Sequence, residues 1–165
     1  MAKKIVIPTD YWVRSLNLVR HAMDMSEAER VRIILLYGIV LTDSITEMLF
    51  FSKWSFLEKV ETREFVSSCK LLHNKYYSRI ESISVDIFTG LSQAAFNNYL
   101  DGNGIEEAYV PTQYSWQHKD SRCVDLLPYF EKCKLPCREI RWEESVELTP
   151  EAADQLETLF FPQQN

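Results

Sequence analysis

The segment Ile33–Phe51, IILLYGIVLTDSITEMLFF, is strongly apolar and carries two carboxylates, Asp43 and Glu47, four residues apart. At 100° per residue both acids share one arc with Leu36, so they interrupt a face that is otherwise apolar. Upstream, Ser26-Glu27-Ala28-Glu29 matches a capping box, which starts a helix by satisfying free backbone N–H groups. We therefore predict a central helix from about Glu27 to Phe51, with its two acids anchoring neighbouring helices.

Three further helices are predicted around this segment. The first runs from Thr9 or Asp10 to about Met23, the second begins at Thr62, and the third begins near Ser84 and ends at Asp101-Gly102. Each has apolar residues at helical spacing, and glycine at a helix end accepts the left-handed conformation at little cost. Residues 9–101 are thus expected to form a helical bundle.

Residues 105–165 have a different character. A short strand is predicted over Glu107–Pro111, a short helix over Ser121–Phe130, and an alternating strand within Cys137–Leu148. Pro150 then opens a last helix, because proline is well suited to the first helical position. Lys3–Ile7 is expected to be a short edge strand ended by Pro8. The predicted fold is a single domain over 1–165, mainly α, with a small α+β C-terminal part.

Composition agrees with helices and with a cytoplasmic location. The 165 residues include only four glycines and six prolines, fewer than a turn-dense sandwich or barrel needs. Asp43 and Glu47 would each cost about 2.5–3.5 kcal/mol near a bilayer centre, which argues against a membrane span. Four cysteines occur without a recognisable signal peptide, so we expect reduced thiols.

The net charge of −6 is unevenly distributed. Residues 1–82 have a balance of +2, whereas residues 83–165 have a balance of −8. An acidic half-molecule repels nucleic acid and attracts basic partners. The leading hypothesis is a non-catalytic inhibitor, of the immunity or phage anti-defence type, that neutralises a basic nuclease toxin or another nucleic-acid enzyme.

The C-terminal acids form the predicted partner-binding surface, in which carboxylates take the place of phosphates and one tryptophan supplies an anchor. Its predicted residues are Glu139, Trp142, Glu143, Glu144, Glu147, Glu151, Asp154 and Glu157. The expected partner is a basic protein, with no direct binding of nucleic acid and no membrane contact.

Arg14 and His21 have six residues between them, a spacing that resembles the Arg-x(4–6)-His motif of HEPN-type ribonucleases. That family is helical and cleaves RNA with its motif residues at a dimer interface. The resemblance covers these two residues and implies an enzymatic alternative. A scaffolding component of a phage or larger assembly is a third possibility.

No cofactor or metal is predicted. The chain has no glycine-rich phosphate loop, which leaves nucleotide binding without support from a motif. His118, Cys123, Cys133 and Cys137 offer thiolates and an imidazole, the ligands that zinc prefers, but the usual Cys-x2-Cys pair is missing. Core packing of the cysteines is the favoured interpretation.

Overall fold

The computed structural model describes residues 1–41 and 45–142. Its strands are β1 (Lys3–Pro8), β2 (Val31–Ile39), β3 (Ile80–Phe88), β4 (Glu107–Thr112), β5 (Cys123–Val124) and β6 (Cys137–Arg141). Its helices are the 3-10 helix η1 (Val13–Leu16), α1 (Asn17–Met25), α2 (Ile45–Phe50), α3 (Lys53–Val60), α4 (Arg63–Lys75), α5 (Gln93–Gly102) and α6 (Leu127–Glu131).

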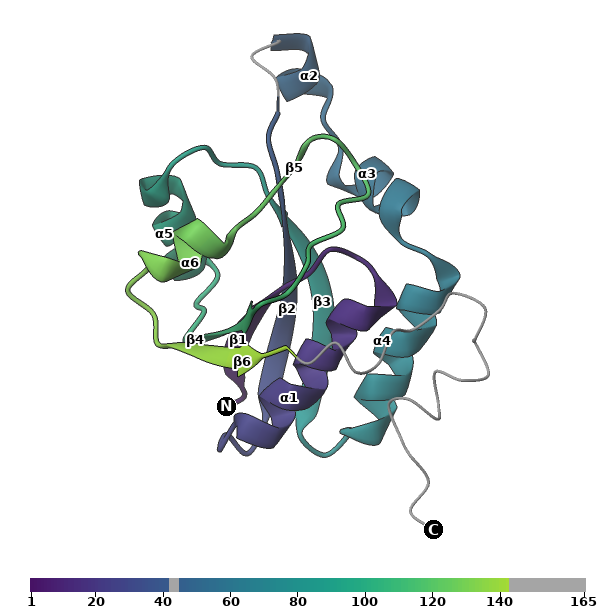
Figure 1. The fold of residues 1–165 in the computed structure, drawn as a ribbon, viewed down its shortest axis with the longest axis vertical. Coiled ribbons are helices and arrows are strands. Elements are labelled where there is room, and N and C mark those ends of the chain that lie inside the picture. The colour runs from purple at the N-terminus through teal and green to yellow at the C-terminus, as the bar shows by residue number, and fades with distance from the viewer. Residues whose placement is uncertain (42–44, 143–165) are drawn as a thin grey trace.

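Within the described residues, six strands form one sheet, and five of them follow the order β3-β2-β1-β4-β6. All neighbours along this path are parallel, and the register pairs Ile5 of β1 with Ile33 of β2 and Glu107 of β4. The short β5 is antiparallel and pairs with the end of β2, at Gly38 and Ile39. The sheet therefore lies at the centre of the molecule, with helices around it (Figure 1).

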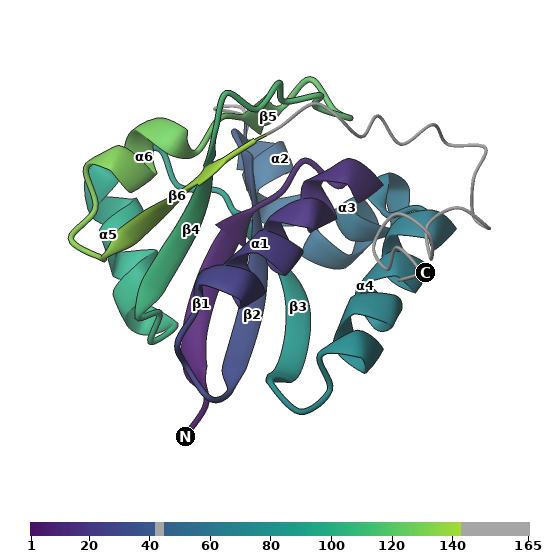
Figure 2. The same ribbon diagram turned by 60° about the horizontal axis from the view of Figure 1, so that its bottom comes forward.

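Helices cover both faces of the sheet (Figures 1 and 2). One face packs against η1, α1, α3 and α4, and its cluster includes Ile5 and Ile33. The other face packs against α5 and α6, and its cluster includes Val6 and Leu36. Successive residues of a strand point to opposite faces, so β1 buries Ile5, Val6 and Ile7 completely.

The predicted helical bundle is wrong, because the molecule is an α/β protein. Residues 33–39 belong to β2 rather than to a central helix, and α2 begins only at Ile45. A strand with helices on both sides needs apolar residues at every position, so it lacks the alternation that would have distinguished it from a buried helix. Ser26 caps the end of α1 instead of starting a helix, and its hydroxyl accepts a hydrogen bond from the Ala28 backbone.

Among the other local predictions, some are confirmed and others are wrong. The helix beginning at Thr62 is confirmed, with the Thr62 hydroxyl accepting from the Phe65 backbone. The strand at Glu107–Pro111 is confirmed as β4. The helix predicted from Ser84 is wrong, because residues 80–88 form β3 and α5 begins at Gln93. Lys3–Ile7 does form a strand, but β1 lies in the middle of the sheet rather than at its edge.

The predicted C-terminal helix from Pro150 lies outside the described residues, as does Asp43. In the described ranges, no helix is long and apolar enough to cross a membrane.

Candidate functional site: the crevice between the ends of β1 and β4

The direction in which the chain builds the sheet reverses between β1 and β4. From β1 the chain adds β2 and then β3 on one side, and it later crosses to add β4 and β6 on the other side. The strand order therefore has its switch point between β1 and β4. In open α/β sheets, ligands bind in the crevice outside the carboxyl ends of the strands at such a switch point.

Two loops meet at this crevice: the β1–η1 loop, residues 9–12, and the β4–β5 loop, residues 113–122. Asp10 joins them, because its carboxylate accepts hydrogen bonds from the Tyr114 hydroxyl at 2.8 Å and from the Gln117 backbone N–H at 3.2 Å. Trp12 adds a second link, since its Nε1 donates to the Gln117 carbonyl at 2.7 Å. The β4–β5 loop is thus fastened over the end of β1.

Asp10 is completely buried. Burial raises the pKa of Asp10 above its ordinary value, although the hydrogen bonds from Tyr114 and Gln117 oppose this change. Arg14 lies nearby, with its Nη2 3.8 Å from the Asp10 carboxylate and its guanidinium 4.8 Å from the centre of the Tyr114 ring. Asp10 therefore serves to hold the two loops together.

The same two loops carry backbone strain. Among the residues that the structure describes, Tyr11 and Gln113 alone combine a side chain with a positive φ, at 64° and 61°. Residues other than glycine adopt this left-handed conformation at a cost of about 1–2 kcal/mol. Tyr11 lies in the β1–η1 loop and Gln113 directly follows β4, so the strain is concentrated at the switch point.

Buried polar atoms without a partner occur here as well. Tyr11 Oη, Arg14 Nε and Trp116 Nε1 are buried and have no hydrogen-bond partner among the described residues. All three belong to the two loops or to the adjoining η1. A buried donor without an acceptor is costly, and in a native protein it is a reason to look for a ligand or an ordered water.

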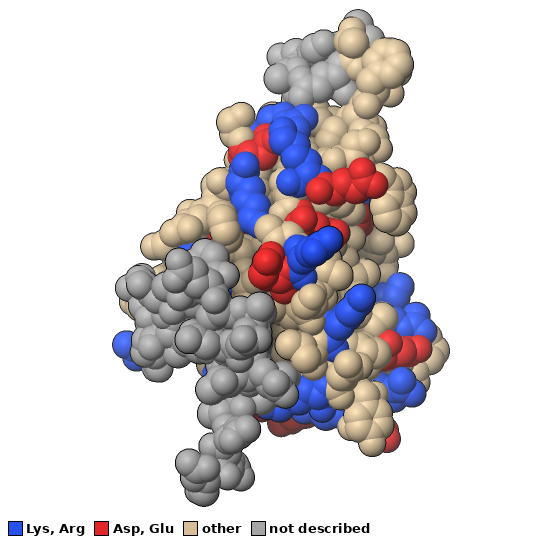
Figure 3. All heavy atoms as spheres, turned by 90° about the vertical axis from the view of Figure 1, so that its right-hand side faces the viewer, with Lys and Arg blue, Asp and Glu red and all other residues tan. Residues whose placement is uncertain are grey.

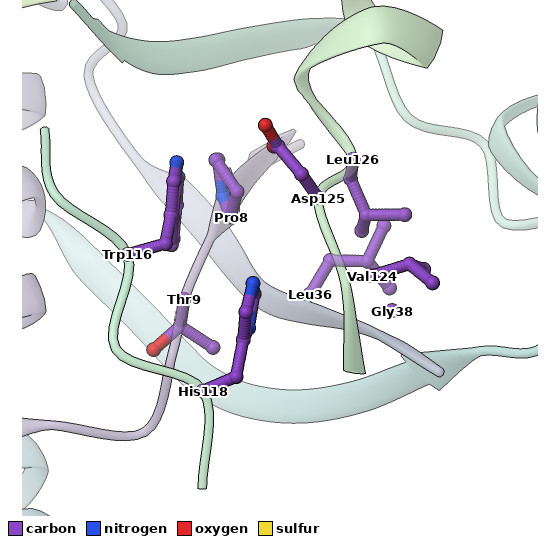
Figure 4. A pocket seen from close by; sticks show the side chains of 9 residues that line it. All are labelled: Pro8, Thr9, Leu36, Gly38, Trp116, His118, Val124, Asp125 and Leu126. Atoms are coloured by element: carbon purple, nitrogen blue, oxygen red, sulfur yellow. The ribbon is translucent and has the colours of Figure 1, made fainter. Parts of the chain in front are cut away.

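Trp116 lines a small cavity at the end of β1, shown in Figure 4. The cavity is lined by Pro8, Thr9, Leu36, Gly38, Trp116, His118, Val124, Asp125 and Leu126. Trp116 and His118, both from the β4–β5 loop, lie on one side, and Val124, Asp125 and Leu126 lie on the other. Its volume of about 10 Å³ has room for one water molecule.

A larger and more open hollow of about 520 Å³ lies beside α2 and α3. Phe50, Phe51 and Phe56 give it an aromatic lining, and Lys59 and Arg122 contribute positive charge. Both cations are paired with Asp120, at 3.4 Å for Lys59 and 3.0 Å for Arg122. On the side of the molecule that carries α3 and α4, basic and acidic residues are interspersed (Figure 3).

The predicted partner-binding residues fall mostly outside the described part of the chain. Glu139 is exposed on β6, as the alternation predicted, whereas Trp142 is only 8% exposed and packs against Tyr114 with ring centres 4.7 Å apart. Glu143, Glu144, Glu147, Glu151, Asp154 and Glu157 lie outside the described residues. The basic protein partner therefore stays a prediction.

The four candidate zinc ligands do not come together. Cys123 packs on the α1/α4 face of the sheet, and its thiol contacts the Tyr37 hydroxyl. Cys133 and Cys137 pack on the opposite face. Among the described residues, no group of three or more His, Cys, Asp and Glu side chains is placed to hold a metal ion.

No family model matches the chain, and no curated protein is similar to it in sequence. Solved structures do resemble it. The hypothetical protein PH0823 matches with a TM-score of 0.52 and 17% identity, over 88% of this chain and 100% of that one. The universal stress protein UspA from Lactobacillus plantarum has a TM-score of 0.51 and 11% identity, over 86% and 97%.

This chain has the fold of the universal stress proteins. A member of that family from Burkholderia pseudomallei also matches, with a TM-score of 0.50 and 8% identity, over 84% of this chain and 95% of that one. Identities this low show the fold alone.

The fold corrects all three functional hypotheses drawn from the sequence. The inhibitor or immunity protein, the HEPN-like ribonuclease and the scaffolding component were proposed for a mainly helical molecule, whereas the structural neighbours are universal stress proteins. Arg14, one half of the HEPN-like pair, donates a hydrogen bond to the Ser115 carbonyl and packs on Tyr114. It is part of the packing between η1 and the β4–β5 loop.

The crevice residues were missed for a physical reason. Thr9 and Asp10 come after the buried run Ile5–Ile7 and Pro8, and from the sequence they were predicted only as helix caps. Polar residues directly after a buried strand are also what a carboxyl-edge site provides, so a correct assignment of β1 would have drawn attention to them. Tyr114 comes 104 positions after Asp10, and local patterns carry no information on such a pair.

Proposed function

We propose that this protein is a non-catalytic binding protein whose ligand is the base of a purine nucleoside or nucleotide. The base enters the small cavity at the carboxyl ends of β1 and β2, beneath the β4–β5 loop. The observation that carries the proposal is the coincidence at the switch point of two strained loops with buried donors that have no acceptor. Strain and unsatisfied groups persist in native proteins mainly where function requires them.

The chemistry of the cavity lining favours a flat heteroaromatic ring. Trp116 and His118 present ring surfaces, and stacking on aromatic side chains contributes about 1–3 kcal/mol per base. The Trp116 N–H has no acceptor, and a ring nitrogen of a purine supplies one. The Asp125 carboxylate, on the other side of the cavity, accepts from an exocyclic amino group.

The phosphates of a nucleotide would contribute little. Residues 113–122 contain no glycine, so the β4–β5 loop cannot bring several backbone N–H groups close to a phosphate. Asp10 and Asp125 also place negative charge near the crevice. We therefore expect the affinities for adenosine, its monophosphate and its triphosphate to differ by less than about tenfold.

The cavity has room for about one water molecule, so a base displaces part of the β4–β5 loop when it binds. Gln117 and His118 have exposed side chains, and the segment moves outward when the backbone hydrogen bonds of Gln117 with Asp10 and Trp12 open. Gln113, in its strained conformation, lies at the start of the loop, where a rotation would move everything up to β5. Binding thereby relieves strain and gives the Trp116 N–H an acceptor.

The test is calorimetric titration of the protein with adenosine, its phosphates and guanosine, supported by thermal unfolding. We expect saturable binding and a higher Tm, because a ligand that binds only the folded state stabilises it by about 2.7 kcal/mol at 100 times Kd. Trp116→Phe keeps the ring but removes the N–H, and it should weaken binding about tenfold. Trp54→Phe makes the same change at a side chain that is 79% exposed, and it should leave binding unchanged.

Three results would count against this function. The absence of binding by any purine at millimolar concentration would remove the ligand class. Binding that is equally tight in Trp116→Phe would place the ligand elsewhere. Release of phosphate or free base during the titration would contradict the non-catalytic part.

A further inference from the structure

Two free thiols lie side by side where α6 leads into β6. Cys133 follows the end of α6, Cys137 is the first residue of β6, and their sulfur atoms are 3.4 Å apart. The connection is Lys134-Leu135-Pro136. A disulfide needs its sulfurs at about 2.05 Å, so these two have to approach by roughly 1.4 Å.

The backbone on both sides of the pair is held in place. Cys137 is paired with Ala108 of β4, and the Ala108 N–H donates to the Pro136 carbonyl at 3.0 Å. On the other side, the Cys133 N–H donates to the carbonyl of Phe130 at 3.3 Å. Phe130 is buried, so the end of α6 is fixed to the core. The proximity of the two sulfurs is therefore built into the fold.

The pair is also within reach of small molecules in solution. Both cysteines are half-buried, while the neighbouring Lys132, Lys134 and Pro136 are exposed. The two lysines attract negatively charged reagents such as glutathione disulfide. Cys69 and Cys123 have no such arrangement, because both pack on the opposite face of the sheet, Cys69 as part of α4 and Cys123 against Tyr37.

We propose that Cys133 and Cys137 form a reversible disulfide by exchange with a low-molecular-weight disulfide. Cys133 loses its proton, and its sulfur attacks one sulfur of the reagent to give a mixed disulfide and one reagent thiol. Cys137 then loses its proton and attacks the Cys133 sulfur, which forms the protein disulfide and releases the second reagent thiol. Overall, two protein thiols are oxidised while one reagent disulfide is reduced to two thiols.

The order of the two steps follows from the surroundings of Cys137. Burial, followed by the hydrogen bond with Cys133, raises the pKa of Cys137 to about 12. At neutral pH this thiol stays protonated, so Cys133 provides the first nucleophile. Cys137 reacts second, when its target sulfur is already adjacent and the reaction takes place within one molecule.

A disulfide across so short a loop is expected to be easily reduced. The stabilisation that a disulfide provides by restricting the unfolded chain grows with the length of the loop it closes, and only three residues separate this pair. In a reducing compartment, disulfides of this kind are transient and respond to redox conditions. The bond would tie the end of α6 to β6, whose far end leads to Trp142 and thus to Tyr114 in the crevice.

The experiment exposes the folded protein to a series of reduced-to-oxidised glutathione ratios. The reaction is quenched with acid, remaining thiols are alkylated with N-ethylmaleimide, and the products are analysed by intact mass and tryptic peptides. We expect two of the four cysteines to escape alkylation without retaining glutathione. Trypsin cuts after Lys134, so the bridge should appear as two peptides linked by a disulfide.

Variants separate this site from unspecific oxidation. Cys137→Ser should stop at a mixed disulfide between Cys133 and glutathione, whereas the double variant Cys69→Ser/Cys123→Ser should still form the bridge. The proposal is overturned if all four thiols of the wild type are alkylated at every ratio, or if Cys133 of the wild type retains glutathione. The outcome is independent of purine binding, because no purine is present.

Discussion

Asp120 shows how single residues fix the β4–β5 loop against α3. Its carboxylate is 8% exposed and accepts hydrogen bonds from Arg122 Nε at 3.0 Å and from the Arg122 backbone at 2.9 Å. Lys59 of α3 lies 3.4 Å from the other oxygen. The hydrogen bonds from Arg122 hold the pKa of Asp120 well below its ordinary value.

We expect Asp120→Asn to lower the free energy of unfolding at pH 7 by about 1–3 kcal/mol, because an uncharged amide loses the charge-assisted bonds. A carboxyl group whose pKa falls on folding contributes its full stabilisation of the folded state when the pH is above the pKa of the unfolded chain, about 3.9. This contribution is lost as the pH falls towards the lower pKa of the folded state. The difference between wild type and variant should therefore narrow below about pH 4.

Urea unfolding at pH 7, 5 and 3 measures this effect. The exposed Asp101 of α5 provides the control, since Asp101→Asn should change stability by less than about 0.5 kcal/mol at each pH. A constant difference for Asp120→Asn over the whole range would contradict the ion-pair explanation.

At the residue scale, the sequence allowed some side-chain roles to be predicted and not others. The Thr62 cap was predictable because a cap and its partner lie three residues apart. Asp10 was not, because its partners Tyr114 and Gln117 lie more than a hundred residues away in the sequence. The candidate site consists almost entirely of contacts between residues that are far apart in the sequence.

At the scale of elements, the decisive error concerned β2. Its sequence VRIILLYGI has few polar interruptions because seven of its nine residues are buried between two layers of helices. Residue periodicity then gives no evidence for a strand, and the adjoining apolar residues up to Phe51 made the segment long enough for a helix. The edge strand β6 was easier to predict from the sequence, because its residues alternate: Glu139 is exposed and Ile140 is buried, as predicted.

The end of β6 is expected to contribute strongly to stability. Trp142 is 8% exposed, and its ring meets that of Tyr114, which in turn packs against Trp116 at 4.6 Å. Trp142→Ala should therefore cost about 3–5 kcal/mol, since it removes a large buried ring and leaves a cavity beneath the β4–β5 loop. Chemical unfolding followed by circular dichroism gives the measurement.

Trp54→Ala is the matched control, because the Trp54 side chain is 79% exposed and its loss should change stability by less than about 0.5 kcal/mol. If the two variants proved equally stable, β6 would not be anchored through this ring.

At the scale of the whole molecule, the topology explains why the low glycine content led to the wrong prediction of a helical bundle. Glycine is needed where chains turn tightly or approach closely, but parallel strands are joined through helices and not through tight hairpins. Four glycines are therefore as compatible with this α/β fold as with a helical bundle. The binding crevice likewise follows from the strand order, a property that no single segment of the sequence reveals.

The sheet separates two apolar clusters, and this separation predicts how mutations combine. Ile87 belongs to the cluster beneath α1 and α4, and Ile105 to the cluster beneath α5 and α6; they are 2% and 5% exposed. Ile87→Val and Ile105→Val should each cost about 0.5–1.5 kcal/mol, the usual effect of removing one buried methylene group. Because they share no packing neighbour across the sheet, the double variant should equal the sum within about 0.5 kcal/mol.

A pair within one cluster gives the contrast. The rings of Phe88 and Phe96 are in edge contact at 5.2 Å, so Phe88→Leu and Phe96→Leu should combine non-additively, by more than about 0.5 kcal/mol. Urea unfolding of the wild type, the single variants and the double variant of each pair measures whether the two effects add. Additivity across the sheet together with coupling within a face would show that the two clusters stabilise the molecule independently, although it unfolds as one cooperative unit. Coupling across the sheet as strong as that between Phe88 and Phe96 would instead mean that the central strands transmit packing strain from one face to the other.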